Sequence, residues 1–124
     1  MKLNESYNLD DFHKTFTKSD LSLMYSRIAD AYSYFQFYEN SYLNYLNSLN
    51  FSPENIDYML KTAVIEIKLS KFEDAKGRLY QIIENNPYHE KSYYNLGLIY
   101  MNVDKKYSKA MTNFEIALSY NPDY

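Results

Sequence analysis

Residues 90–122 read EKSYYNLGLIYMNVDKKYSKAMTNFEIALSYNP and contain two segments in which apolar side chains recur at helical spacing. In the second segment Met111, Phe114 and Leu118 lie three and four residues apart, so a helix would place them on one face. Glycine occurs once in this stretch, and strict alternation of apolar and polar residues is almost absent, which argues against strands. The stretch therefore predicts two helices joined by a turn.

The same pattern recurs through the chain with a period of 34 residues. The three prolines, Pro53, Pro87 and Pro122, are separated by 34 and 35 residues. Small residues keep this period in two series: Ala29, Ala63, Gly97 and Ser41, Ala75, Ala110. Large residues keep it in two others: Tyr25, Met59, Tyr93 and Tyr45, Leu79, Phe114. Because small residues let helices approach closely and large ones fill the gaps, the pattern predicts three helix–turn–helix units.

The period and local signals predict where the helices begin and end. We expect helices near residues 21–35, 38–50, 54–68, 71–85, 88–102 and 106–120, and a further one near 8–17. Each proline follows a good N-cap residue and is expected at the first position of a helix. Ser70 and Glu73 have the spacing of a capping box.

Two irregularities of the repeat carry expectations of their own. The third unit is one residue longer than the period, and the extra residue is expected in the turn 102–106, where an insertion costs little. Gly77 falls inside the predicted helix 71–85, where glycine costs about 1 kcal/mol relative to alanine. We therefore expect a structural reason for Gly77, such as close packing.

Composition and charge exclude several classes of function. A chain of 124 residues suggests one domain or one short array of repeats. The absence of cysteine excludes a disulfide scaffold, a zinc finger and a thiol nucleophile, and two isolated histidines argue against a metal site. The formal net charge of −3 lacks the basic excess of nucleic-acid-binding proteins. The sequence has no apolar run long enough to span a membrane and no N-terminal signal segment, so we expect a cytoplasmic protein that binds neither membrane nor nucleic acid.

The chain resembles the tetratricopeptide repeat, a helix–turn–helix unit of 34 residues. The third unit carries the family pattern almost whole: Tyr93, Leu96, Gly97, Tyr100, Ala110, Phe114, Ala117 and Pro122. The second unit departs from it at Thr62, where leucine is usual, and at Glu66, where tyrosine is usual. The first unit is degenerate. The resemblance covers residues 21–124 and implies an all-α, right-handed superhelix of three units, near 22–55, 56–89 and 90–124. Residues 1–20 would be an N-terminal arm or a capping helix.

The resemblance also implies a concave groove, lined by the first helix of each unit, that binds a segment of another protein. The groove residues it singles out are Arg27, Tyr34, Leu60, Lys61, Val64, Lys68, Lys91, Tyr94, Asn95, Leu98 and Asn102. The apolar members would hold apolar side chains, the basic members would pair with carboxylates, and the asparagines would hold a peptide backbone. A partner segment with mixed apolar and acidic residues fits this set. Each position also has a plainer interpretation, as a solvated polar residue or a contact between helices.

Some members of the family clamp the C-terminal carboxylate of heat-shock chaperones. The corresponding positions here hold Ser26, Asp30, Lys61, Lys91 and Asn95. Only Lys91 matches the clamp, and Asp30 would repel a carboxylate. The sequence therefore argues against a co-chaperone of that kind.

Catalysis has little support in the sequence, which predicts no catalytic residue and no cofactor. Neither His13 nor His89 has a serine or acid arrangement close to it in sequence, and there is no glycine-rich phosphate loop. We therefore expect a non-enzymatic module whose groove binds a peptide segment of a partner protein. Two alternatives stay open: a small chaperone similar to the three-repeat chaperones of type III secretion, and a recruiting domain of a larger enzyme.

The two ends of the sequence bear on its oligomeric state. A homodimer could form through the N-terminal helix or through the last repeat, whose face has no following helix to cover it. Asn121 and Pro122 resemble the start of another helix, so we expect an excerpt of a longer protein, and a natural end covered by a second copy is the alternative.

Overall fold

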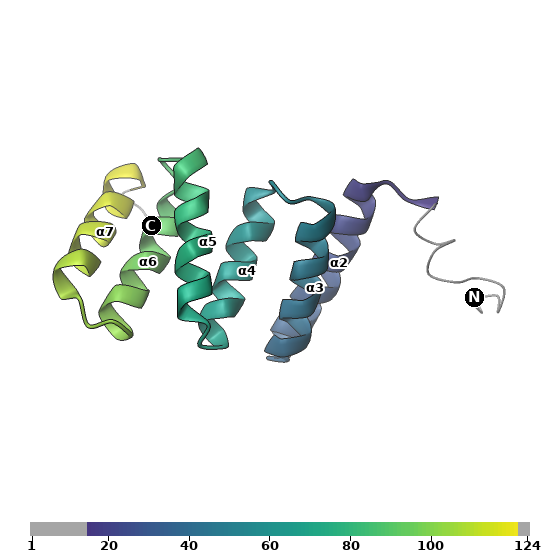
Figure 1. The fold of residues 1–124 in the computed structure, drawn as a ribbon, viewed down its shortest axis with the longest axis horizontal. Helices are drawn as coiled ribbons and strands as arrows, with labels where there is room; N and C mark the ends of the chain where they lie inside the picture. Colours follow the sequence, from purple (N-terminus) through teal and green to yellow (C-terminus); the bar gives the residue numbers. More distant parts are fainter. Residues whose placement is uncertain (1–14, 122–124) are drawn as a thin grey trace. The chain divides into compact units, whose positions relative to one another are not determined.

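The computed structural model describes residues 15–121, and every regular element in this range is a helix (Figure 1). The elements are α2 (Lys18–Tyr34), α3 (Tyr38–Phe51), α4 (Ile56–Lys68), α5 (Phe72–Asn85), α6 (Glu90–Asn102) and α7 (Tyr107–Tyr120). They confirm the all-α prediction, and no boundary differs from its predicted place by more than three residues. The helix predicted near 8–17 falls mainly on residues outside the described range.

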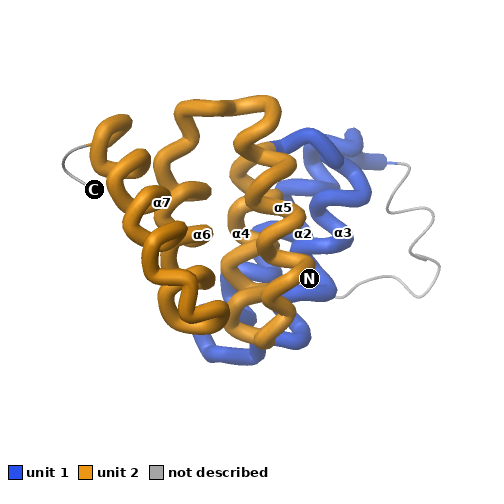
Figure 2. The backbone as a smooth tube through the Cα atoms, turned by 60° about the vertical axis from the view of Figure 1, so that its left-hand side comes forward, with its two compact units in different colours: residues 1–55 blue, residues 56–124 orange. Residues whose placement is uncertain are grey.

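The helices pack in consecutive pairs, α2 with α3, α4 with α5 and α6 with α7. In addition, α6 contacts both α5 and α4. The chain forms two compact units, residues 1–55 and 56–124 (Figure 2). The first unit contains α2 and α3, and the second contains α4 to α7. The division between Asn55 and Ile56 coincides with the predicted end of the first repeat.

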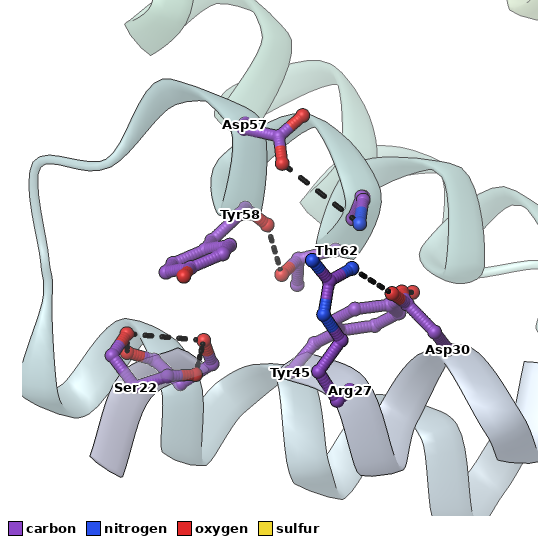
Figure 3. A network of polar contacts seen from close by, with 9 residues as sticks. Ser22, Arg27, Asp30, Tyr45, Asp57, Tyr58 and Thr62 are labelled. Carbon is purple, nitrogen blue, oxygen red and sulfur yellow. Dashed lines mark hydrogen bonds and ion pairs between the residues drawn. The ribbon is translucent and has the colours of Figure 1, made fainter. Parts of the chain in front are cut away.

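Buried serine hydroxyls join α2 to α3 in the first unit. Ser22 Oγ donates to the carbonyl of Ser48, and Ser48 Oγ donates to the carbonyl of Ser22, each at 2.7 Å (Figure 3). Ser41 Oγ donates to the carbonyl of Ala29 at 2.9 Å. All four residues are buried, and the bonds satisfy polar groups that water does not reach. Small side chains that bond across the interface thus let the degenerate repeat pack closely.

Apolar side chains fill the second unit. Four of its core residues are buried almost completely: Leu79, Ile82, Leu96 and Ile99. At the recurring small positions, Ala63 and Ala75 are fully buried. Gly97 on α6 lies directly against the ring of Phe114 on α7. The series of small and large residues that defines the period therefore corresponds to close contacts between helices.

The turns inside the three pairs share one backbone feature. One residue of each turn is left-handed, with φ of 64°, 60° and 57° at Gln36, Ser70 and Lys105. An amide closes each turn by donating to a carbonyl: Phe37 to Tyr32, Lys71 to Glu66 and Lys106 to Tyr100. The span is five residues in the first two turns and six in the third. The extra residue of the third repeat therefore lies in this turn, as predicted.

The prediction that a proline opens each helix is wrong at both places that the structure describes. Pro53 and Pro87 lie in the turns after α3 and α5, and the next helices begin three residues later. Ser52 and Asn86 are accordingly C-caps rather than N-caps. Proline suits this place because it cannot continue the preceding helix. Pro122 lies outside the described residues.

The capping box predicted at Ser70 and Glu73 is also wrong. Lys71 is the N-cap of α5, and its side chain makes no capping hydrogen bond. A capping box occurs instead at the start of α2. There Thr17 Oγ1 accepts from the amide of Asp20, and Asp20 Oδ2 accepts from the amide of Thr17, both at 3.1 Å. This box explains why α2 begins before its predicted first residue.

The expected packing reason for Gly77 is absent. A Cβ built on this residue would have nothing within 4 Å. Gly77 is exposed on α5, so the expectation of close packing is wrong.

Candidate functional site

The predicted binding residues of the second unit lie on α4 and α6, the first helices of their pairs. Each position on α4 has a counterpart 34 residues later on α6. The pairs are Leu60 and Tyr94, Lys61 and Asn95, Val64 and Leu98, and Lys68 and Asn102. Their spacing of three and four residues places the members of each helix on one face. Because α4 contacts α6, we treat these eight residues and Lys91 as one candidate surface, the α4–α6 surface.

The apolar members of the α4–α6 surface are half-buried. They are Leu60, Val64, Tyr94 and Leu98. On the same helix as Tyr94, by contrast, Leu96 and Ile99 are buried in the core. The ring of Tyr94 packs against Phe114 on α7, with 5.9 Å between ring centroids. An apolar strip thus remains accessible beside the core.

Lysine side chains accompany this strip. Lys61 Nζ lies 3.8 Å from Asp57 Oδ2, one turn earlier on α4. Asp57 is largely exposed, so this ion pair adds little to stability, and a partner carboxylate can compete for the ammonium. Lys68 and Lys91 are exposed. The surface therefore presents ammonium groups together with apolar side chains.

The two asparagines of the surface differ in their surroundings. Asn95 Nδ2 donates to the carbonyl of Lys91 at 2.8 Å, within α6. This bond engages one amide hydrogen of Asn95, so a peptide backbone would have to use the rest of the amide or displace it. Asn102 is the last residue of α6 and is exposed.

Arg27 and Tyr34 lie on α2 and are described within the first unit. Both are exposed. Arg27 Nη1 lies 3.4 Å from Asp30 Oδ2, as Figure 3 shows. Tyr34 packs edge-on against Phe35, with 5.1 Å between ring centroids. Each predicted residue is thus accessible, but each already has a partner on its own helix or in the adjoining turn.

The carboxylate clamp has no counterpart in the first unit. Ser26 is buried, so it does not present its hydroxyl to a ligand. Asp30 Oδ1 accepts a hydrogen bond of 2.5 Å from the hydroxyl of Tyr45 (Figure 3). The negative charge of Asp30 is therefore built into the α2–α3 pair, where a clamp would need a cation or an amide.

The turn between α2 and α3 exposes several aromatic side chains. Of these, only Tyr34 was predicted as a site residue. Tyr34, Phe35 and Phe37 are 82%, 66% and 59% exposed. The backbone does not require them, because the turns after α4 and α6 have a left-handed residue of the same kind with other side chains around it. The signal in the sequence was the run of five aromatic residues within 32–38.

A buried ion pair joins α4 to α5 and was also missed. Arg78 Nε and Nη2 donate to Glu66 Oε1 and Oε2 at 2.9 and 3.0 Å. Glu66 is fully buried. The sequence did mark this position, because tyrosine is usual there in the tetratricopeptide repeat. It could not indicate Arg78 as the partner, because Arg78 lies on another helix. This pair holds the fold together and is not part of the α4–α6 surface.

A second polar cluster connects α5 to α6 and to the turn after it. Lys76 Nζ donates to Asp104 Oδ2 at 2.9 Å and lies 3.0 Å from Glu73 Oε1. Hydrogen bonds to these two carboxylates, first to Asp104, raise the pKa of Lys76. The hydroxyls of Tyr80 and Tyr100 are hydrogen-bonded to each other. Burial, helped by this bond, raises the pKa of Tyr80 to about 12.

A histidine and a serine meet at the start of α6. His89 Nδ1 and Ser92 Oγ are 2.8 Å apart, and burial lowers the pKa of His89. Ser92 is fully buried, so its hydroxyl is not accessible to a substrate. The pair therefore fixes the first turn of α6 and does not form an accessible nucleophile.

Within residues 15–121, no three histidine or acidic side chains come close enough together to hold a metal ion. None of the helices there has the length and apolar character needed to cross a membrane.

Solved structures with the same helix arrangement identify the fold. The first tetratricopeptide domain of Spaghetti (RPAP3), bound to the HSP90 peptide SRMEEVD, matches with a TM-score of 0.78 and 19% identity, over 87% of this chain and 85% of that chain. The chain has the tetratricopeptide-repeat fold. The tetratricopeptide domain of OM64 from Arabidopsis matches with a TM-score of 0.80 and 17% identity, over 86% of this chain and 88% of that one. The crystal structure of MamA matches with a TM-score of 0.76 and 17% identity, over 92% of this chain and 65% of that one.

No protein-family model and no curated protein matches the sequence. The tetratricopeptide-repeat fold is usually non-catalytic and is typical of protein–protein interaction modules. Within it, α4 and α6 are the first helices of the second and third repeats.

Proposed function

We propose that this protein is a non-enzymatic interaction module that binds a peptide segment of a partner protein on the α4–α6 surface. The observation that carries the proposal is the half-buried apolar strip of Leu60, Val64, Tyr94 and Leu98 on two helices in contact. Accessible apolar area in register over neighbouring helices gains free energy when a partner covers it, roughly 25 cal/mol per Å². The fold supports this interpretation, because tetratricopeptide domains are typical interaction modules.

The chemistry of the surface favours a partner segment that mixes apolar and acidic residues. Lys61, Lys68 and Lys91 would meet carboxylates while the strip holds apolar side chains. Exposed ammonium groups of this kind contribute more to specificity and association rate than to affinity. The peptide bound to the Spaghetti domain, SRMEEVD, combines apolar and acidic residues in the same way. We expect no preference here for a terminal carboxylate, because Ser26 is buried and Asp30 is anionic.

Fluorescence anisotropy with short synthetic peptides tests the proposal. The panel contains labelled peptides that alternate leucine or methionine with glutamate or aspartate, and matched peptides in which the acids are replaced by glutamine or asparagine. We expect binding to the acidic–apolar peptides and weaker binding to their amide counterparts. Failure of every acidic–apolar peptide to bind would exclude this class of partner.

A charge-reversed surface locates the site. In the variant with Lys61→Glu and Lys91→Glu, affinity for the acidic–apolar peptides should fall at least about tenfold, or about 1.4 kcal/mol. The variant with Lys18→Glu and Lys106→Glu makes the same change of net charge away from this surface and should bind as the wild type does. Surface substitutions usually change stability by less than about 0.5 kcal/mol, so both variants should fold, which circular dichroism checks. Equal affinity in the two variants would move the site elsewhere.

The apolar strip has its own test. Replacing Leu60 and Leu98 by serine should weaken binding of the acidic–apolar peptides and of their amide counterparts alike, since both use the strip. Selective loss of only the acidic peptides would contradict the assignment of these two residues to apolar contacts.

A further inference from the structure

We propose that copies of this protein associate head to tail, with α2 of one copy packing on α7 of the next. The inference goes beyond peptide binding and rests on a contact that the second unit already contains. There α6 packs against α5, the second helix of the preceding pair. In the repeat pattern, α2 and α6 are both first helices of a pair, and α5 and α7 are both second helices. Thus α2 is the counterpart of α6, and α7 is the counterpart of α5.

The α5–α6 contact defines which faces meet. The hydroxyl of Tyr100 on α6 bonds to that of Tyr80 on α5, and Lys76 Nζ of α5 lies 5.5 Å from the centroid of the Tyr100 ring. Leu96 lies one turn before Tyr100 and therefore on the same face of α6. Both residues are buried, Leu96 completely. This face of α6 is thus the one that a preceding second helix covers.

The matching face of α2 is accessible. Ile28 and Tyr32 are the counterparts of Leu96 and Tyr100, two repeats earlier. Ile28 is 45% exposed and Tyr32 is half-buried. The first unit therefore keeps accessible an apolar helix face whose counterpart in the second unit is buried.

The matching face of α7 is accessible as well. Met111 and Leu118, the counterparts of Lys76 and Ile83, are 60% and 51% exposed. An open pocket of about 450 Å³ lies beside Leu118. Its lining includes Tyr94, Phe114, Ala117 and Leu118. The counterparts of Phe114 and Ala117 on α5 are the buried core residues Leu79 and Ile82.

A second copy of the chain is the partner for these faces, because one chain carries both a first-helix face, on α2, and a second-helix face, on α7. The face of α2 has the character of the α6 face that covers α5, and α7 presents apolar Met111 and Leu118 at the positions of Lys76 and Ile83 on α5. The polar positions also correspond, since Glu115 on α7 replaces Tyr80. A Tyr32 hydroxyl in the place of Tyr100 would donate to the Glu115 carboxylate, and its ring would lie over Met111 where Tyr100 lies near Lys76.

Charge favours the same pairing. The described part of the first unit contains four acidic residues and two basic ones. They are Asp20, Asp30, Glu39 and Glu54 against Lys18 and Arg27. At the other end of the contact, Lys105, Lys106 and Lys109 lie in and just after the turn that leads into α7. The acidic excess comes from Glu39 and Glu54, which lie outside α2, and it steers the first unit of one copy toward the lysines beside α7 of another.

A head-to-tail contact uses two different faces, so it grows into open chains unless the geometry closes a ring. Analytical ultracentrifugation of the full chain over a range of concentrations tests this. We expect the weight-average mass of the wild type to rise with concentration beyond that of a dimer. A wild type that stays monomeric at every concentration would overturn the proposal.

Three matched lysine substitutions resolve the geometry. Ile28→Lys blocks the α2 face, Leu118→Lys blocks the α7 face, and each variant alone should stay at the monomer mass. Their equimolar mixture should reach the mass of a dimer and stop there, because only one intact pair of faces remains. Leu43→Lys changes a leucine on α3 that is 60% exposed, and this variant should associate as the wild type does.

The alternatives give different results. Association lost in Leu118→Lys but kept in Ile28→Lys would indicate a symmetric contact between two α7 helices and overturn the head-to-tail arrangement. A mixture that stays monomeric would overturn it too. The Lys61→Glu, Lys91→Glu variant should still associate, because neither lysine belongs to the α2 or the α7 face, although Tyr94 borders both the α4–α6 surface and the pocket beside Leu118.

Discussion

The ring of Phe114 fills the space in which a side chain at Gly97 would begin. A Cβ built on Gly97 would lie 2.6 Å from Phe114 Cε1 and 2.7 Å from Cδ1. Distances this short do not occur between real side chains, so α6 and α7 can pack this closely only with glycine at residue 97. This relationship supplies the first prediction.

Gly97→Ala should destabilise the fold. The added methyl group must displace the Phe114 ring or separate the helices, and overpacking of this kind costs about 1–3 kcal/mol. Urea unfolding followed by circular dichroism measures the change in the free energy of unfolding. Combining Gly97→Ala with Phe114→Leu should recover part of the loss, whereas strictly additive costs would contradict a direct clash.

Gly77→Ala should act in the opposite direction. Nothing lies within 4 Å of a Cβ at this exposed position of α5, so the methyl group meets no obstacle. Alanine in a helix interior is more favourable than glycine by about 0.5–1 kcal/mol, because glycine loses more conformational freedom on folding. The same urea titration serves as the measurement, and a lower free energy of unfolding would contradict the open environment of Gly77.

Replacing Arg78 should lower the free energy of unfolding more than replacing Glu66 does. Arg78→Leu leaves a fully buried carboxylate without its guanidinium, and breaking such a pair costs about 3–5 kcal/mol. Glu66→Leu should cost less, because the Arg78 side chain is 23% exposed and water can solvate its charge. The double replacement should recover most of the loss, and a double-mutant cycle in urea measures the coupling. Equal and additive costs would show that the two charges are not coupled.

Protonation of His89 should destabilise the protein. Burial lowers the pKa of His89 below its unfolded value near 6.5, so the unfolded chain binds the proton more tightly. The stability that this histidine contributes is therefore complete above about pH 6.5 and is lost as the pH falls through the lower folded pKa. Glu90 and Asp57 oppose the lowering and Lys91 reinforces it, but burial dominates.

Thermal unfolding at about pH 7.5 and about pH 5.5 checks this sign, since the melting temperature should be lower at the acidic pH. His89→Gln should reduce the difference between the two melting temperatures, and His13→Gln is the matched control. An unchanged difference in His89→Gln would assign the pH dependence to other groups.

Most of the fold could be predicted from the sequence because helix packing itself imposes the period. Residues such as Ala63 and Leu79 recur where helices touch, so their spacing indicates both the helices and their pairing. The starts of α4 and α6 were placed too early because proline suits the first turn of a helix and also the turn after one. Local sequence does not distinguish these two places for Pro53 and Pro87.

The accessible positions of the candidate site also follow from the period, since residues 34 apart share a face on successive first helices. The period alone does not reveal which of these positions are buried by a neighbour. Ser26 has the same register as Leu60 and Tyr94 but is buried, because burial depends on the side chains that the fold brings around a position. The binding role of the accessible positions stays a prediction.

The sequence by itself determined six helices, their pairing in repeats and the turn that holds the extra residue, because these depend on local spacing and on a period repeated along the chain. Only the tertiary structure decided that Gly97 is required while Gly77 is not, and that Glu66 is neutralised by Arg78. Both outcomes depend on side chains brought together from different helices, and the space and charge at such a contact are set by the two partners jointly.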